Sequence, residues 1–102
     1  MRSANSGQLT LSVLKALDVL ECLHGQRTPL APAQVASRIG VSRPTAYRLL
    51  ATMANRGWVA KDLQDPSKYR IGYRVLQLAG GLLDDLDIRQ VARPFMEQLS
   101  RQ

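Results

Sequence analysis

The sequence has 102 residues, which suffices for one small domain, and 45% of them are hydrophobic, so a packed core is possible. Its formal net charge of +6 and isoelectric point of about 10.3 favour an anionic partner. One cysteine, Cys22, excludes an intrachain disulfide, and the chain has neither a signal-peptide pattern nor a membrane-length apolar run, so we expect a cytoplasmic protein.

The positive charge is concentrated in one part of the chain. Between Gly25 and Lys61 there is no Asp or Glu, and the same interval holds six basic side chains: Arg27, Arg38, Arg43, Arg48, Arg56 and Lys61. After Tyr73 acidic and basic residues balance one another. An anionic partner would therefore meet the middle of the sequence.

The first elements are a leader and two helices. Residues 1–8 are polar and are expected to form a disordered leader. Residues 11–23 predict a helix, because polar residues recur at every third position among apolar ones. Pro32 suits the first turn of a second helix that ends at Ile39, although Ala31 before it is a poor cap.

Gly40 and Ser42 predict a helix-turn-helix. Glycine can adopt the left-handed conformation that ends the second helix, and Ser42 can cap a third helix that runs to about Arg56. Gly57 then ends that helix. The spacing is that of a DNA-binding helix-turn-helix, in which the second helix of the motif enters the major groove.

A short hairpin is expected to follow. Residues 58–60 and 69–71 are strand candidates, and the polar turn between them would form a wing. The fold class is therefore mainly α, a winged helix-turn-helix over residues 9–72. Residues 73–86 predict an apolar linker and dimerisation helix, and Asp87 would cap a last helix that reaches Gln102.

The third helix should present its arginines outward. At 100° per residue Ala46, Leu49, Leu50 and Met53 gather on a core side. Pro44, Arg48, Ala51 and Asn55 point away from it. Tyr47 occupies one flank, and Thr45 and Thr52 occupy the other.

This outward face is the predicted DNA contact. Arg43 and Pro44 lie in the first turn, and Arg48 could pair with guanine or a phosphate. Tyr47 and Thr45 could contact phosphates or a thymine methyl, and Ser42 lies at a helix N-terminus that attracts phosphate. The full set of predicted DNA-binding residues is Ser42, Arg43, Pro44, Thr45, Tyr47, Arg48, Thr52, Lys61, Ser67, Lys68 and Arg70.

Other chemistry has little support in the sequence. One cysteine and one histidine cannot form a zinc cluster, and no glycine-rich phosphate loop follows a strand. No catalytic set of Ser or Cys with His can be assembled around His24. We therefore predict no enzyme activity, no metal and no cofactor.

The chain resembles the amino-terminal domain of IclR-type bacterial transcriptional regulators from Ser12 to about Ser100. The segments that carry the resemblance are, in order, Val13–Leu20, Ser42–Leu50, Arg56–Val59, Lys68–Gly72, Val75–Leu78 and Asp87–Pro94. Each segment alone is weak, whereas their order and spacing together are specific. Two departures are Ala31, where a serine or threonine often caps the second helix, and a wing without the family's usual glycine.

The resemblance implies a homodimer on a roughly palindromic double-stranded operator, in the bacterial cytoplasm and associated with the nucleoid when bound. It also implies that residues 87–102 begin an effector-binding domain absent from this chain, through which alone a small-molecule effector would act. Two other functions stay open: a winged helix used only for protein interaction or dimerisation, and binding of structured RNA. Duplex DNA is favoured over RNA because A-form RNA hides its major groove.

Overall fold

The computed structural model describes residues 8–85, which form four helices and one two-stranded hairpin. The helices are α1 (Leu11–His24), α2 (Pro32–Ile39), α3 (Arg43–Asn55) and α4 (Tyr73–Asp85). The strands β1 (Val59–Lys61) and β2 (Tyr69–Ile71) lie between α3 and α4. The fold is the predicted winged helix-turn-helix. The last predicted helix and all of the leader except Gln8 fall outside the described residues.

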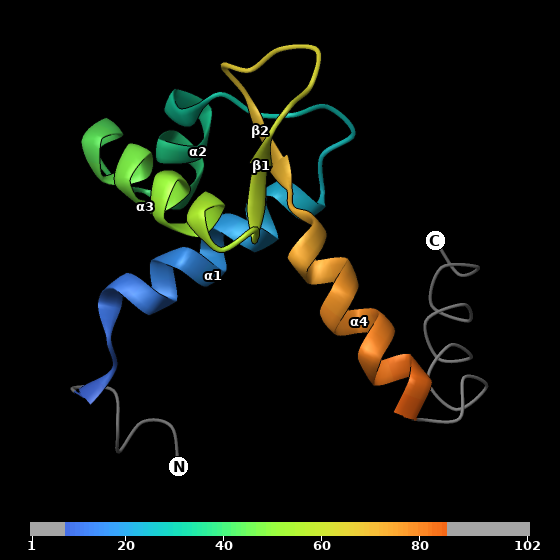
Figure 1. Ribbon diagram of the computed structural model, residues 1–102. Coiled ribbons are helices and arrows are strands. Elements are labelled where there is room, and N and C mark those ends of the chain that lie inside the picture. Colours follow the sequence, from blue (N-terminus) through green and yellow to red (C-terminus); the bar gives the residue numbers. More distant parts are fainter. Residues whose placement is uncertain (1–7, 86–102) are drawn as a thin grey trace, which may run out of the picture.

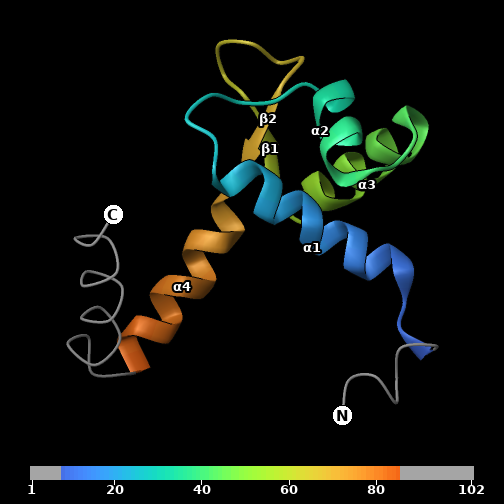
Figure 2. The ribbon, with the colours of Figure 1, turned by 180° about the vertical axis from the view of Figure 1, so that it is seen from behind.

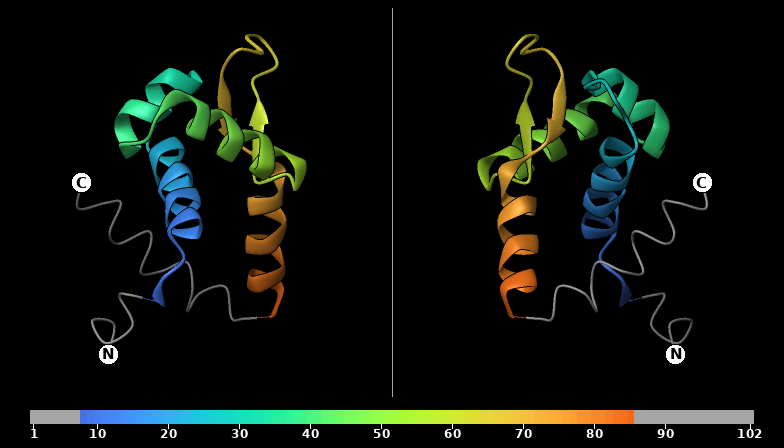
Figure 3. Two further views of the ribbon diagram at one scale, coloured as in Figure 1. Left: turned by 90° about the vertical axis from the view of Figure 1, so that its left-hand side faces the viewer. Right: turned by 90° about the vertical axis from the view of Figure 1, so that its right-hand side faces the viewer.

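The wing extends from one side of the body, and helices α1 and α4 extend from the other. The loop between β1 and β2 rises beside α2 and α3, while α1 and α4 extend the other way (Figures 1 and 3). Seen from behind, α1 runs beneath α2 and α3 toward the base of the hairpin (Figure 2). Because α1 packs against α2, α3 and β2, it forms the floor of the domain.

The core joins all these elements except α4. Its buried members come from α1, the link between α1 and α2, α2, α3 and the hairpin, and they are Val19, Leu23, Leu30, Val35, Leu50, Met53, Val59 and Tyr69. The predicted core side of α3 is confirmed, since Ala46 and Leu50 are fully buried, Met53 is buried and Leu49 is half-buried. α4 packs against β1, but none of its residues is buried.

Both predicted glycine stops are confirmed. Gly40 ends α2 with φ +75°, and Gly57 follows α3 with φ +82°. After α3 the N–H of Trp58 donates to the Met53 carbonyl at 3.0 Å, and that of Gly57 donates to the Ala54 carbonyl at 3.0 Å. This pair of hydrogen bonds is a Schellman motif, which requires a left-handed residue at Gly57.

The same motif corrects the predicted first strand. Because the Trp58 N–H is hydrogen-bonded to the end of α3, β1 begins one residue later than predicted. It runs to Lys61 instead of Ala60. Val59 then pairs with Ile71, and Lys61 with Tyr69, in an antiparallel register. The first helix also differs slightly from prediction, because α1 continues one residue further to His24.

The link between α1 and α2 adds a bridge to the hairpin. Leu30 bridges Tyr69, with hydrogen bonds of 3.0 Å from the Leu30 N–H and 2.7 Å from the Tyr69 N–H. Leu30 is also buried in the core. The link between α1 and α2 is therefore tied to β2, which fixes the wing relative to the helix-turn-helix.

Candidate nucleic-acid interface

The turn between α2 and α3 sets where α3 begins. The N–H groups of Gly40 and Val41 both donate to the Ala36 carbonyl at 3.0 Å, which closes the end of α2. Two residues on, Ser42 caps α3, because its Oγ accepts the N–H of Thr45 at 3.3 Å. The positive end of the α3 dipole therefore lies at an exposed surface.

A lysine of α1 supports this turn from below. The Lys15 ammonium donates to the Ile39 carbonyl at 3.2 Å, at the last residue of α2. A cation suits this position, since a helix C-terminus carries partial negative charge. Sequence analysis does not predict this contact, because a hydrogen bond between residues 24 positions apart leaves no local signal.

The outward face of α3 matches the predicted wheel. Arg43, Pro44 and Arg48 are exposed, as are Ala51, Thr52 and Asn55 further along the helix. Tyr47 is also exposed, while Thr45 is half-buried. Among residues 8–85 an ion pair forms only between Lys68 and Asp65, so no carboxylate described there neutralises the arginines of α3.

Hydrogen bonds along this face link successive turns of α3. The Ser42 hydroxyl donates to Thr45 Oγ1 at 2.9 Å, and Arg48 Nη2 donates to the same oxygen at 3.4 Å. The Thr52 hydroxyl instead donates to the Arg48 carbonyl at 2.7 Å. Thr45, Arg48 and Thr52 also line a groove shared with Ser12 and Leu17 of α1. The predicted residues Ser42 to Thr52 thus lie on one helix, with these three on its α1 side.

The wing holds the other predicted residues. Lys61 and Arg70 are exposed on the strands, and Arg70 Nη1 donates to the Ile71 carbonyl at 3.1 Å. At the tip, Ser67 is exposed, whereas Lys68 is half-buried and lies 3.8 Å from the Asp65 carboxylate. The predicted wing residues therefore form a second group, which lies on the hairpin beside α3.

Two aspartates organise the wing loop. The Asp62 carboxylate accepts the N–H groups of Gln64 and Asp65 at 3.0 and 2.9 Å. Asp65 Oδ1 accepts the Ser67 hydroxyl at 2.6 Å and its N–H at 3.2 Å. The hydrogen bonds from Ser67, and then the Lys68 ammonium, lower the pKa of the Asp65 carboxyl. Asp62 and Asp65 reduce the net positive charge of the wing, and their hydrogen bonds stabilise its turn.

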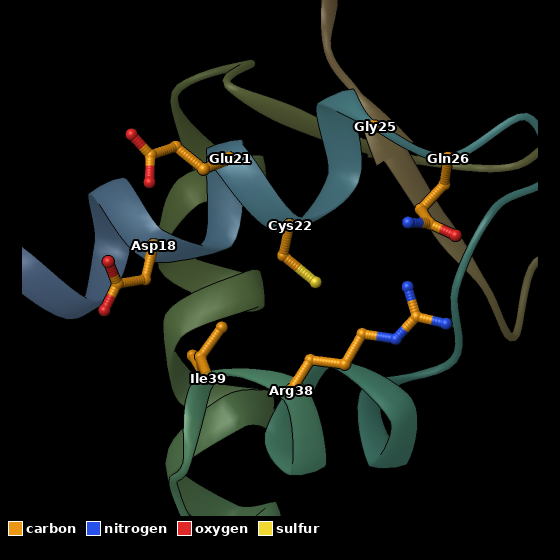
Figure 4. Close-up of a pocket in the computed structure, with 7 residues that line it drawn as sticks. All are labelled: Asp18, Glu21, Cys22, Gly25, Gln26, Arg38 and Ile39. Atoms are coloured by element: carbon orange, nitrogen blue, oxygen red, sulfur yellow. The ribbon is translucent and has the colours of Figure 1, made fainter.

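A second hollow lies on the other side of α1, between α1 and α2 (Figure 4). Cys22 and Arg38 point into it, while the carboxylates of Asp18 and Glu21 point away from the thiol. Partial burial raises the pKa of the Cys22 thiol, and the Arg38 guanidinium acts in the opposite direction. A raised pKa favours the protonated thiol, which is a weaker nucleophile than the thiolate.

Neither a metal cluster nor a membrane helix is present in the described part of the chain. Within residues 8–85 no three His, Cys, Asp or Glu side chains gather as a metal ion would require. None of the helices in that range combines the length and hydropathy that a membrane crossing needs.

Comparison with known proteins places this arrangement in one family. The sequence profile of the IclR helix-turn-helix domain matches residues 12–63. The HTH-type transcriptional regulator XynR of Escherichia coli is 30% identical over 90 residues, which are 88% of this chain and 35% of XynR. The regulator KdgR of the same organism is 31% identical over 90 residues, which are 88% of this chain and 34% of KdgR.

Solved structures agree in fold. The crystal structure of an IclR family transcriptional regulator from Brucella abortus matches 92% of this chain and 35% of its own, with a TM-score of 0.68 and 29% identity. An IclR-type regulator from Alicyclobacillus acidocaldarius matches 90% of this chain and 37% of its own, with a TM-score of 0.70 and 26% identity. The chain spans about a third of the length of the curated relatives it matches.

Proposed function

The chain belongs to the IclR helix-turn-helix family, and from that membership we propose that it binds double-stranded operator DNA sequence-specifically as the DNA-binding part of a transcriptional regulator. The observation that carries this proposal is the outward face of α3. It combines exposed arginines, a capped N-terminus and no acidic residue. An exposed α-helix of this kind fits the major groove of B-DNA.

In this proposal the two groups of residues have different tasks. Arg43, Pro44, Tyr47 and Arg48 enter the major groove, and the Ser42 end of α3 meets a phosphate. The wing contacts the DNA backbone through Lys61, Ser67, Lys68 and Arg70. The pairing of Lys68 with Asp65 argues that the wing contributes less than α3 does.

A homodimer would place two copies of α3 on a roughly palindromic site. Exposed apolar side chains on α1 and α4 support this part of the proposal. They are Leu11, Val13, Leu14 and Leu17 on α1, and Tyr73, Leu76, Leu78 and Leu82 on α4. Residues 9–72 would then be the DNA-binding unit and residues 73–86 the linker that dimerises it. The cytoplasm is the proposed location.

Selection of binding sites from a random DNA pool, with the 102-residue chain, tests the proposal. A common half-site repeated at a fixed spacing is the expected result, with an affinity that falls steeply as salt is added. Recovery of random sequences with a flat salt response would contradict sequence-specific binding.

The same apolar faces of α1 and α4 also support a second function. A winged helix that serves only protein interaction or dimerisation would also expose leucines on α1 and α4. Such a module would show no retention of duplex DNA at low salt, together with a stable dimer in sedimentation. The arginines of α3 favour the DNA-binding function over this one.

A further inference from the structure

We infer that Thr45 is a positioning residue, which orients the guanidinium of Arg48 for one base pair of the operator. The inference rests on the proposed function and names one residue that contributes to the DNA sequence preference of the chain. Thr45 would act through Arg48, whereas the sequence alone gave it a DNA contact of its own.

The hydroxyl of Thr45 holds two neighbours at once. Its Oγ1 accepts the Ser42 hydroxyl at 2.9 Å and Arg48 Nη2 at 3.4 Å. A threonine oxygen has two acceptor sites, so both are in use. Ser42 is in turn held by the Thr45 N–H at 3.3 Å, so the cap of α3 and the side chain of Arg48 belong to one chain of hydrogen bonds.

The spacing explains why these three residues meet. Positions three apart on a helix or its cap lie on neighbouring turns of the same side. Thr45 is half-buried between Ser42 and Arg48, which are both exposed. It is therefore recessed beside the groove between α1 and α3, and Arg48 projects further toward any ligand on this face.

An anchored guanidinium suits base recognition. Reading guanine through O6 and N7 needs both donors of the arginine fork in one plane. A free arginine would lose several rotamers on binding, whereas one already hydrogen-bonded loses fewer. The second guanidinium nitrogen of Arg48 and its remaining N–H groups have no partner among residues 8–85 that would compete with DNA.

Thr52 provides a matched control on the same side of α3. Its hydroxyl donates to the Arg48 carbonyl and so contacts the backbone, with no contact to the guanidinium. Replacing either threonine by valine removes one hydroxyl at constant shape. Only the change at Thr45 should alter how Arg48 reads a base.

The test is a double-mutant cycle on the selected operator and on duplexes that each carry one altered base pair. Arg48→Ala should lower discrimination at one base pair by about 10-fold or more. Thr45→Val should lower discrimination at that same base pair by roughly 3- to 10-fold. The double variant should match Arg48→Ala, and Thr45→Ser should retain discrimination. Any effect of Thr52→Val should add to that of Arg48→Ala, because the Thr52 hydroxyl contacts only the backbone carbonyl that the alanine variant retains.

Three results would overturn the inference. They are independent, multiplying effects of Thr45→Val and Arg48→Ala, an effect of Thr45→Val at a different base pair, or no effect of it at all. Thermal unfolding of each variant separates loss of fold from loss of discrimination, and Thr45→Ala replaces Thr45→Val if the valine variant does not fold. If the unaltered chain prefers no sequence, the proposed function itself fails, which is a distinct outcome.

Discussion

α3 and α4 are each 13 residues long and both carry apolar residues at helical spacing, yet they use them differently. α3 buries Ala46, Leu50 and Met53 in the core and keeps a polar, arginine-bearing face outward. α4 buries nothing and leaves Leu76 73% exposed. The same kind of pattern thus stabilises the domain in one helix and leaves an unpartnered surface in the other.

The cause of the difference is position relative to the core. α3 lies between α1, α2 and β1, so its apolar side is covered on folding. α4 starts at the hairpin, where the Arg74 N–H donates to the Gly57 carbonyl at 3.0 Å, and then runs away from the body (Figure 3). Removing side chains from each helix should therefore have separable effects.

The largest expected effect is on folding. Leu50→Ala in α3 should lower the free energy of unfolding by about 2–5 kcal/mol, because it leaves a cavity in the core. Leu82→Ala in α4, where the leucine is 54% exposed, should change it by less than about 1 kcal/mol. Urea unfolding of both variants at low protein concentration measures the difference, and equal losses would contradict the contrast between the helices.

The next effect is on DNA affinity. Arg48→Ala should weaken operator binding by about 1–3 kcal/mol and relax specificity at one position. Arg74→Ala is the matched control, since Arg74 is an exposed arginine of α4 whose Nη1 donates to Gln77 Oε1 at 3.2 Å. Titration of labelled operator at fixed salt compares the two. An unchanged affinity after Arg48→Ala would remove this residue from the interface.

A third effect concerns self-association. Leu76→Asp should weaken the proposed dimer by roughly 10-fold or more, because it places a charge in an apolar contact. The exposed Gln77→Asp is its control, on the same turn but outside the apolar face. Sedimentation equilibrium over a range of concentrations checks both variants. A dimer indifferent to Leu76→Asp would assign the contact to α1 or elsewhere.

The smallest effect is in the wing. Hydrogen bonds from Ser67 lower the pKa of Asp65 in the folded chain, so its carboxylate stabilises the loop at pH values above its unfolded pKa. This contribution is lost as the pH falls through the folded pKa. NMR titration of the Ser67 amide should report that midpoint, and Asp65→Asn should abolish it. A midpoint at the ordinary value for aspartate would show that the turn is not formed in solution.

Local patterns in the sequence determined most of the helix-turn-helix. Gly40, Ser42 and Pro32 act through their own backbone conformation or side chain, so their roles at the helix ends could be predicted and are confirmed. The buried side of α3 was equally predictable, because a helical wheel needs only the residue order. The outward residues follow from the same wheel, while their contact with DNA stays a prediction.

Tertiary contacts decided the rest. Nothing near Leu30 in the sequence indicates that it pairs with Tyr69, and Lys15 meets Ile39 only once α1 and α2 have packed. At Ala31 a missing side-chain cap is offset by Gln34 Oε1, which accepts the Ala31 N–H at 2.8 Å. The apolar pattern of α4 predicted a helix correctly, but only the packed structure determined that its face is left uncovered, because burial depends on which elements come together.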